Sequence, residues 1–370
     1  MQIYRVGGYV RDKLLGVKPH DCDYVVIGST PEQMLEQGYQ QVGKFFPVFL
    51  HPQTQAEYAL ARTEFKQGTG HTGFQVNSSP HVSLEQDLFR RDLTINAIAE
   101  DQDGNIIDPY HGQADLKQKI LRHVSTAFAD DPLRVLRVAR FAAKLNFSVA
   151  KETLFLMQQM AQNGEGLSLS RERVLNELNK ALECKYSYNF FSVLRKTHNL
   201  GVFFPTLDLK LKSDKDFTKF IHDLQTSTNQ LQRYQLIALY LNTAPTEKNL
   251  TEISKDKRLL KMLYQTQLIR QLSENPQLSP ENQLNHFKQL DIWRNYAQFA
   301  RLCTNYAEHL NSCQQTNSLK HLKSLIQLAQ ELKNVPLQKI VSQHSEQPIK
   351  LAQAIKQLYL DLISQTKDLA

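Results

Sequence analysis

The sequence predicts an α+β protein, with a mixed sheet and helices at the N-terminus followed by a region that is entirely helical. Short apolar segments typical of strands are confined to roughly the first 125 residues. From Ala127 onward strand patterns disappear and apolar residues recur with a helical period. The 370 residues are enough for two or three domains. We therefore expect a mixed domain at residues 1–125, a helical segment at 126–185 and a second helical region at 186–370.

Each expected element depends on a local pattern. Strands are predicted at 25–27, 47–50 and 58–61, where β-branched and aromatic residues cluster. The Asp103-Gly104 pair predicts a hairpin turn over 101–105. The glycine-rich segment 68–73 predicts a mobile loop. Helices are expected to begin at 130–132, where Pro132 lies in the first turn, and at 169–172.

Composition narrows the class of protein. No run of 18 apolar residues exists, so we expect no transmembrane helix, and the first residues lack a signal-peptide pattern. The four cysteines are scattered without a metal-binding spacing, which favours a reducing, cytoplasmic location. A net charge of +7 favours a polyanionic partner.

Asp21 and Asp23 are the most informative pair of residues in the chain. They precede the apolar run 24–27, and in a strand residues i and i+2 point to the same face. Two carboxylates on one face are costly unless a cation lies between them, so the pair predicts a site for Mg²⁺. A solvated turn is the common alternative for such a spacing. Glu57 could supply a third catalytic carboxylate from a neighbouring strand, and an exposed strand residue is an equally good interpretation of it.

Glycine and arginine residues near this pair suggest a phosphate site. Gly7-Gly8 is followed by Arg11, and such a turn can hold phosphates through backbone N–H groups and a guanidinium. Arg90 and Arg91 precede Asp92 in a segment that continues into apolar residues. A half-buried arginine needs an anion, which is either Asp92 or a ligand phosphate. Carboxylates for a metal beside a phosphate site predict phosphoryl or nucleotidyl transfer.

A polar stripe follows at three-residue intervals in an otherwise apolar helix. Its members are Asp131, Arg134, Arg137 and Arg140. Because the intervening residues are almost all apolar, we expect this helix to be buried and its stripe to line a cavity, rather than to form ion pairs on the surface.

An aspartate beside an arginine can also distinguish bases. Cytosine and adenine each present an amino donor next to a ring-nitrogen acceptor, and uracil and guanine present the reverse order. A carboxylate accepts from the amino group and a guanidinium donates to the ring nitrogen. The pair Asp131 and Arg134 could therefore admit C and A and reject U and G.

Taken in order, these segments resemble those of bacterial CCA-adding enzymes, the tRNA nucleotidyltransferases of the class II polymerase-β-like superfamily. The resemblance covers roughly the first 185 residues, and the series is more diagnostic than any one motif. Its matching segments are 6–16, 21–23, 90–97, 108–112, 115–116, 131–141 and 170–173 with Glu177.

The resemblance implies a polymerase-β-like head at 1–125, a neck that recognises the base at 126–185, and a tRNA-binding body and tail at 186–370. It implies that Asp21 and Asp23 hold Mg²⁺, and that the partners are tRNA, CTP and ATP, with no DNA and no membrane. The residues that it implies for nucleotide binding are Gly8, Arg11, Arg91, Asp131, Arg134, Arg137 and Arg140. Glu172, Arg173 and Glu177 would brace the neck helix, and movement of the 68–73 loop would help the switch from C to A addition.

The C-terminal half departs from many relatives, which carry a metal-dependent HD phosphohydrolase domain after the neck. Within this half His222-Asp223 is the only His-Asp pair, and the apolar helix over 236–242 has Leu241 where a metal ligand would be needed. We therefore expect a helical domain without phosphohydrolase activity. Its basic clusters suit contacts with the tRNA backbone, although each cluster alone could be ordinary surface; they are Lys210, Lys212, Lys215, Lys255, Lys257, Arg258 and Lys261.

Other functions fit parts of the pattern. A poly(A) polymerase of the same superfamily shares the head motifs, and a partial enzyme could add only CC or only A. A non-catalytic RNA-binding protein on an inactive head is a rival of a different class, but the intact pair Asp21 and Asp23 argues against it.

Overall fold

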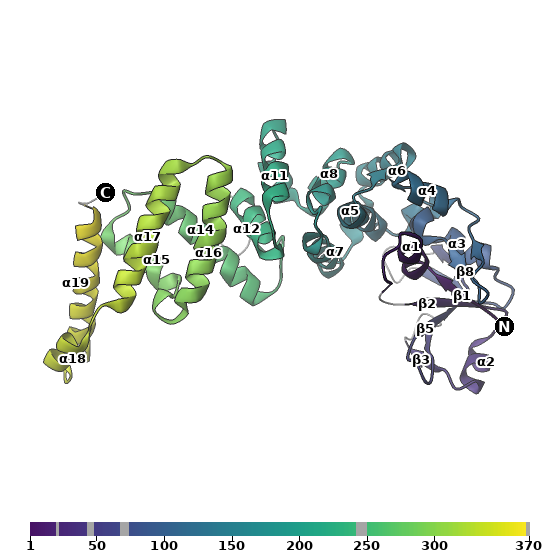
Figure 1. The fold of residues 1–370 in the computed structure, drawn as a ribbon, viewed down its shortest axis with the longest axis horizontal. Helices are drawn as coiled ribbons and strands as arrows, with labels where there is room; N and C mark the ends of the chain where they lie inside the picture. Colours follow the sequence, from purple (N-terminus) through teal and green to yellow (C-terminus); the bar gives the residue numbers. More distant parts are fainter. Residues whose placement is uncertain (20–21, 43–47, 67–73, 242–249, 368–370) are drawn as a thin grey trace. The chain divides into compact units, whose positions relative to one another are not determined.

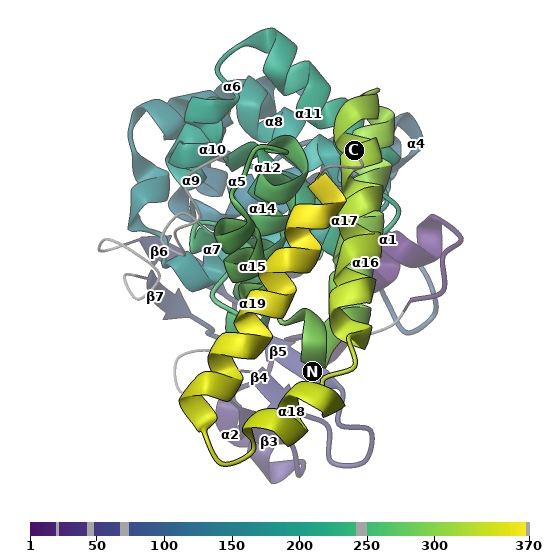
Figure 2. The same cartoon turned by 90° about the vertical axis from the view of Figure 1, so that its left-hand side faces the viewer.

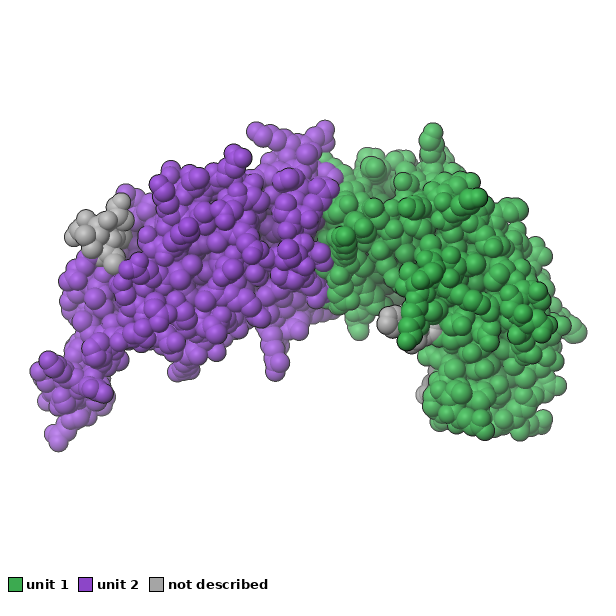
Figure 3. Space-filling model, viewed as in Figure 1, with its two compact units in different colours: residues 1–205 green, residues 206–370 purple. Residues whose placement is uncertain are grey.

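The computed structural model describes residues 1–19, 22–42, 48–66, 74–241 and 250–367. The chain divides into two compact units, residues 1–205 and 206–370, which are coloured separately in Figure 3. Asp21 and the expected loop at 68–73 lie outside the described residues. None of the described helices is both long enough and apolar enough to cross a membrane.

The first unit is built on a seven-stranded mixed sheet in the order β3-β4-β5-β2-β1-β8-β9 (Figure 1). The pair β2 and β5 is parallel, and the other neighbours are antiparallel. The strand bounds are β1 Gln2–Val6, β2 Asp23–Ile27, β3 Gln40–Val42, β4 Val48–Leu50, β5 Glu57–Leu60, β8 Ala99–Glu100 and β9 Ile106–Ile107. These bounds confirm the three predicted strands, except that Pro47 lies outside the described residues and that β5 ends at Leu60, one residue before the predicted end.

The sheet register places the start of β2 beside the glycine turn. Asp23 is paired with Val6, the residue before Gly7, and Tyr24 is paired with Tyr58 in the parallel neighbour. Asp23 and Glu57, the first residues of β2 and β5, therefore lie at the same edge of the sheet.

Successive side chains of β2 point to opposite faces of the sheet, and both faces are covered by helices. Val25 belongs to a cluster with Leu88 of α3 (Leu84–Phe89), and Val26 to a cluster with Met34 of α2 (Pro31–Glu36) on the other face. The helix α1 (Gly8–Leu14) follows β1 directly. The predicted hairpin turn connects β8 to β9, where the Asp101 carboxylate accepts from two backbone N–H groups of the turn.

Two further small sheets lie in this unit. The hairpin of β6 (Thr63–Lys66) and β7 (Phe74–Asn77) is antiparallel, and β10 (Ile120–Leu121) pairs in parallel with β11 (Ser148–Val149). The expectation that strands end before Ala127 is therefore wrong at β11. A strand of two residues is too short to show the alternation on which a sequence-based prediction depends.

Helices make up the rest of the first unit. Their bounds are α4 Gly112–Gln118, α5 Leu133–Leu145, α6 Lys151–Gln162, α7 Arg171–Glu183, α8 Tyr188–Lys196 and α9 Asn199–Phe203. Short 3₁₀ turns span Thr94–Asn96, Thr126–Asp130 and Glu165–Ser168. As predicted, α5 is buried on most of its surface, because it packs between α7 and α8. The predicted start of α7 is also confirmed, since the Ser170 hydroxyl accepts from the N–H of Arg173.

The described part of the second unit is helical throughout, as the sequence predicts. Its helices are α11 Asp214–Thr226, α12 Gln230–Leu241, α14 Lys257–Glu274, α15 Pro280–Gln289, α16 Ile292–Ser312, α17 Thr316–Asn334, α18 Gln338–His344 and α19 Pro348–Lys367, with α10 Pro205–Lys210 at the boundary. Within it α16 packs along α17, and α17 contacts α19, drawn in yellow in Figure 2.

Candidate active site

A cleft of about 810 Å³ in the first unit brings together residues from the sheet, α1, α5 and α7. Ten basic side chains and three aspartates line it among the described residues, so an anionic ligand is favoured. The basic residues are Arg11, Arg62, Arg90, Arg91, Arg134, Arg137, Arg140, Lys144, Arg173 and Lys180; the aspartates are Asp23, Asp92 and Asp131.

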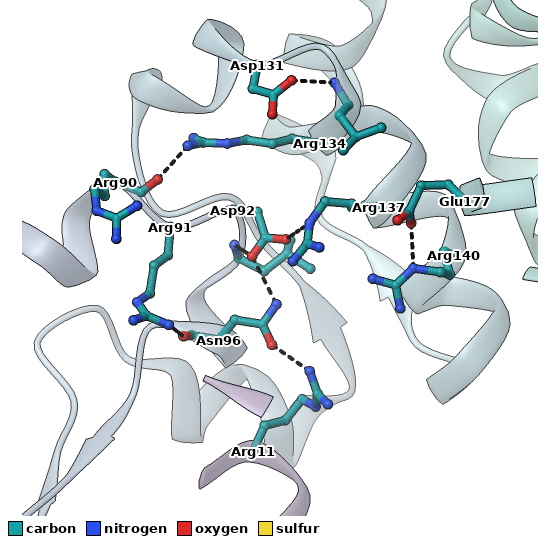
Figure 4. Close-up of polar contacts among 12 residues, drawn as sticks. Arg11, Arg90, Arg91, Asp92, Asn96, Asp131, Arg134, Arg137, Arg140 and Glu177 are labelled. Atoms are coloured by element: carbon teal, nitrogen blue, oxygen red, sulfur yellow. Dashed lines mark hydrogen bonds and ion pairs between the residues drawn. The ribbon is translucent and has the colours of Figure 1, made fainter. Parts of the chain in front are cut away.

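Asp92 is a nearly buried carboxylate at the centre of the polar contacts in Figure 4. Its Oδ2 accepts from Nε of Arg137 at 2.7 Å, and its Oδ1 accepts from the Asn96 amide at 2.9 Å. Burial alone would raise the pKa of Asp92, but the charge of Arg137 and these hydrogen bonds lower it to about 2. The same ion pair raises the pKa of Arg137. The structure thus joins the segment 94–96 to α5 through one charged carboxylate.

Asn96 extends this network to the glycine turn. Its side-chain oxygen accepts from Nη1 of Arg11 at 2.7 Å, and Arg11 is only 4% exposed. Gly7 has φ +68°, and a Cβ at this position would lie 3.0 Å from Nη1 of Arg91. The positive φ favours glycine here, and a Cβ would also crowd the Arg91 guanidinium.

Asp87 holds the two consecutive arginines, and the sequence interpretation missed it. It is fully buried on α3, and its carboxylate pairs with Arg90 at 2.9 Å and with Arg91 at 3.2 Å. Although burial acts to raise the pKa of Asp87, the two guanidinium groups lower it. The anion that half-buried arginines require is thus Asp87 rather than Asp92. A signal was present in the sequence, since Asp87 lies three and four residues before the arginines at helical spacing.

Asp131 and Arg134 lie at the start of α5, as the sequence predicts, and both line the cleft. One oxygen of Asp131 accepts from the N–H of Leu133 at 3.0 Å, and the other accepts from Arg173 of α7 at 3.0 Å. Arg134 donates to the carbonyl oxygens of Ala127 at 2.8 Å and Arg90 at 2.6 Å. Backbone and neighbouring side chains therefore fix the positions of both groups.

Two ion pairs connect α7 to the stripe on α5. Arg173 contacts Asp131, and Glu177, which is 5% exposed, accepts from Nε of Arg140 at 2.5 Å. Glu172 is exposed and lies outside the cleft lining. Of the three residues expected to brace the helix, Glu177 thus contacts α5 itself and Arg173 contacts Asp131, just before the first residue of α5.

Phe141 is a second residue that the sequence interpretation did not single out. Its ring lies 4.4 Å from the guanidinium carbon of Arg140, 5.1 Å from that of Arg11 and 5.7 Å from that of Arg137. A ring face attracts cations, so Phe141 helps to hold three like charges together. In the sequence it is indistinguishable from the other apolar residues of α5.

The expected metal ligands are only partly placed. Asp23 is an exposed carboxylate in the lining of the cleft, and in the sheet it pairs with Val6, the residue before the glycine turn. Asp21 lies outside the described residues. Carboxylate oxygen is the donor that Mg²⁺ prefers, so Asp23 fits such a site. Glu57 is exposed and is absent from the described cleft lining, although it shares the sheet edge with Asp23.

Comparison with known proteins gives the family. Residues 3–122 match the poly A polymerase head domain, and residues 146–211 match the probable RNA and SrmB-binding site of polymerase A. Nucleotidyltransferases with this head are typically metal-dependent. The CCA-adding enzyme of Alteromonas mediterranea is 39% identical over 397 residues, covering 98% of this chain and 99% of its own.

Other relatives match over about half of their own length. The multifunctional CCA protein of Acinetobacter baylyi is 60% identical over 211 residues, which are 56% of this chain and 51% of that protein. Among solved structures, the Bacillus stearothermophilus CCA-adding enzyme in complex with CTP has the same fold, with a TM-score of 0.69 and 22% identity over 98% of this chain and 89% of that one. The full-length match to the Alteromonas enzyme shows that the chain belongs to the CCA-adding enzymes, a family of tRNA nucleotidyltransferases.

Proposed function

We propose that this chain builds the complete CCA end of tRNA, adding two C from CTP and one A from ATP. In each step the 3′-hydroxyl oxygen of the tRNA forms a bond to the α-phosphorus of the nucleotide. The bond between the α-phosphorus and the bridging oxygen breaks, and pyrophosphate leaves. The observation that carries the proposal is the cleft in which Asp131 and Arg134, fixed by neighbouring groups, share one lining with clustered arginines.

The residue roles follow from the side chains of the cleft. Arg11 and Arg91, beside the turn at Gly7 and Gly8, bind the triphosphate, because guanidinium groups match phosphate oxygens. Asp131 accepts from the amino group of C or A, and Arg134 donates to the adjacent ring nitrogen. Arg137 and Arg140 complete the pocket, and Asp92 and Glu177 orient them.

Asp23, together with Asp21, would hold Mg²⁺, and Glu57 remains a candidate third carboxylate. When bound, such an ion polarises the α-phosphate and stabilises the leaving pyrophosphate. The head at 1–125 and neck at 126–185 would then form the catalytic part, and the body and tail at 186–370 would bind tRNA without phosphohydrolase activity.

An extension assay tests this function. The purified protein, with Mg²⁺, receives tRNA lacking its last three nucleotides and CTP, ATP or both. Addition of two C and then one A, followed by a stop, supports the proposal. Long A tails would indicate a poly(A) polymerase, and a stop after CC would indicate a partial enzyme. Asp23→Ala should abolish addition while tRNA binding persists, and Asp103→Ala, in the exposed turn, is the matched control.

A further inference from the structure

Three side chains with metal-binding chemistry meet in the second unit, far in sequence from the cleft residues. Asp223 lies on α11, His309 lies on α16, and Cys313 caps the end of α16. We propose that Asp223, His309 and Cys313 form a binding site for a divalent transition-metal ion, and that Zn²⁺ fits it best. One ligand atom from each residue lies within 4.8 Å of the others.

The distances between these atoms are close to those of a metal centre. Nδ1 of His309 lies 3.5 Å from Oδ2 of Asp223, and Sγ of Cys313 lies 3.8 Å from each of these two atoms. Tetrahedral Zn²⁺ with ligand bonds of roughly 2.0–2.3 Å separates such donors by about 3.3–3.6 Å. The three groups therefore need to approach one another by only a few tenths of an ångström.

The surroundings of Asp223 are unusual for a buried acid. It is 1% exposed, and within the described part of the chain neither lysine nor arginine forms an ion pair with it. Its one strong side-chain hydrogen bond comes from the Tyr240 hydroxyl at 2.7 Å. The His309 ring is a basic group beside it, with Nδ1 3.5 Å from Oδ2. Buried carboxylates are generally paired with a cation or bound to a metal, and a metal ion held by both side chains would supply that charge.

The donor atoms of the three side chains indicate which metal ion the site would bind. One thiol, one imidazole and one carboxylate suit Zn²⁺, whereas Mg²⁺ and Ca²⁺ prefer oxygen alone. His309 and Cys313 are four residues apart and therefore lie on the same side of the helix end. The neighbouring His222 is exposed, so His222 and Asp223 do not act as a unit and the site differs from an HD phosphohydrolase centre.

Space for a fourth ligand lies beside the three residues. A cavity of about 80 Å³ borders Asp223 and His309, which is enough for a water molecule. The ion would join the C-terminal ends of α11 and α16, two helices that already pack against each other. Its binding energy would add to the stability of residues 206–370, whereas all described residues of the catalytic cleft belong to residues 1–205.

Cobalt is a suitable probe, because a Co²⁺–thiolate bond gives a charge-transfer band in the near ultraviolet. Full-length protein freed of metal with a chelator is titrated with Co²⁺ and then with Zn²⁺. We expect one equivalent of Co²⁺ to produce the band and Zn²⁺ to remove it. Cys313→Ser should abolish the band, and His309→Gln should weaken Co²⁺ binding by at least about tenfold.

Variants of two other cysteines serve as controls that the Co²⁺ band comes from Cys313. Cys22→Ser and Cys184→Ser should retain the band, and Cys22 matters because it lies between the two aspartates of the proposed Mg²⁺ site. Zn²⁺ should raise the thermal unfolding temperature of the wild type but not of Cys313→Ser. Absence of the band in the wild type, or its persistence in Cys313→Ser, overturns the proposal. If Cys313→Ser does not fold, an undiminished band in His309→Gln overturns it equally.

Discussion

Asp92 connects the segment after α3 to the helix α5 through a single side chain. Each of its two oxygens has a different partner. One oxygen accepts from Arg137 of α5, and the other accepts from Asn96, which in turn accepts from Arg11. The carboxylate must remain charged to keep Arg137 in place. Its protonation is therefore a point at which pH acts on the whole site.

Replacing Asp92 by Asn keeps the shape of the side chain and removes its charge. We expect the free energy of unfolding to fall by about 2 kcal/mol at pH 7, because a buried group loses its ion pair. The pKa of Asp92 is about 2 in the folded protein, below the value of roughly 4 for an unfolded chain. Its contribution is thus complete above about pH 5 and is lost as the pH falls toward 2.

Urea unfolding at successive pH values checks this prediction. The difference between wild type and Asp92→Asn should shrink from about pH 5 to pH 3. Asp103→Asn, in the exposed hairpin turn, should match the wild type throughout. A difference that stays constant as the pH falls would contradict the assignment.

Arg134 is the proposed donor to the base. Arg134→Ala should raise incorporation of UTP relative to CTP by about tenfold or more, since a lost pair of base contacts costs roughly 1–3 kcal/mol of discrimination. The measured quantity is the ratio of the two incorporation rates, so a uniform loss of activity does not count. Arg294→Ala on the exposed side of α16 is the control. Unchanged selectivity would remove Arg134 from base recognition.

At the scale of elements, α3 matters because it carries Asp87, the anion that holds Arg90 and Arg91. A capping box fixes its start: the Ser83 hydroxyl accepts from the N–H of Gln86, and the Gln86 side chain accepts from the N–H of Ser83. A short helix depends strongly on such caps because it has few internal hydrogen bonds.

Ser83→Ala should therefore destabilise the protein by about 1 kcal/mol. It should also raise the KM for CTP, since the two arginines depend on the position of α3. Thermal unfolding and initial-rate measurements check both effects. Ser78→Ala, in the preceding loop, serves as the control, and equal behaviour of the two variants would show that the cap does not position the arginines.

The elements differ in how far the sequence predicts them. The strand β2 and the helix starts at α5 and α7 follow from local patterns, namely an apolar run, a proline and a serine cap. Phe141 and Asp223 could not be predicted in the same way, because their partners are chosen by tertiary packing. Cys313, for example, meets Asp223 across 90 residues of intervening chain.

At the scale of the whole molecule, the excess of positive charge should govern the interaction with tRNA. The chain carries a net charge of +7, and a bound polyanion releases counterions in proportion to its phosphate contacts. Even two such contacts predict about a tenfold weaker affinity when salt rises from roughly 50 to 200 mM.

Steady-state kinetics at increasing KCl concentration checks this expectation. The KM for tRNA should rise steeply and linearly on a logarithmic plot, and the KM for CTP should rise less, because CTP carries fewer phosphates. A KM for tRNA that is independent of salt would show that shape and base contacts, rather than charge, dominate binding.

The clustering of basic side chains in one cleft also has a consequence for the life of the protein in the cell. Like charges held close together oppose the folded state, even where Phe141, Asp87 and Asp92 offset part of the repulsion. A bound triphosphate removes that opposition and stabilises the folded form by mass action. The resistance of this protein to heat and proteolysis should therefore rise with the concentration of CTP or ATP around it.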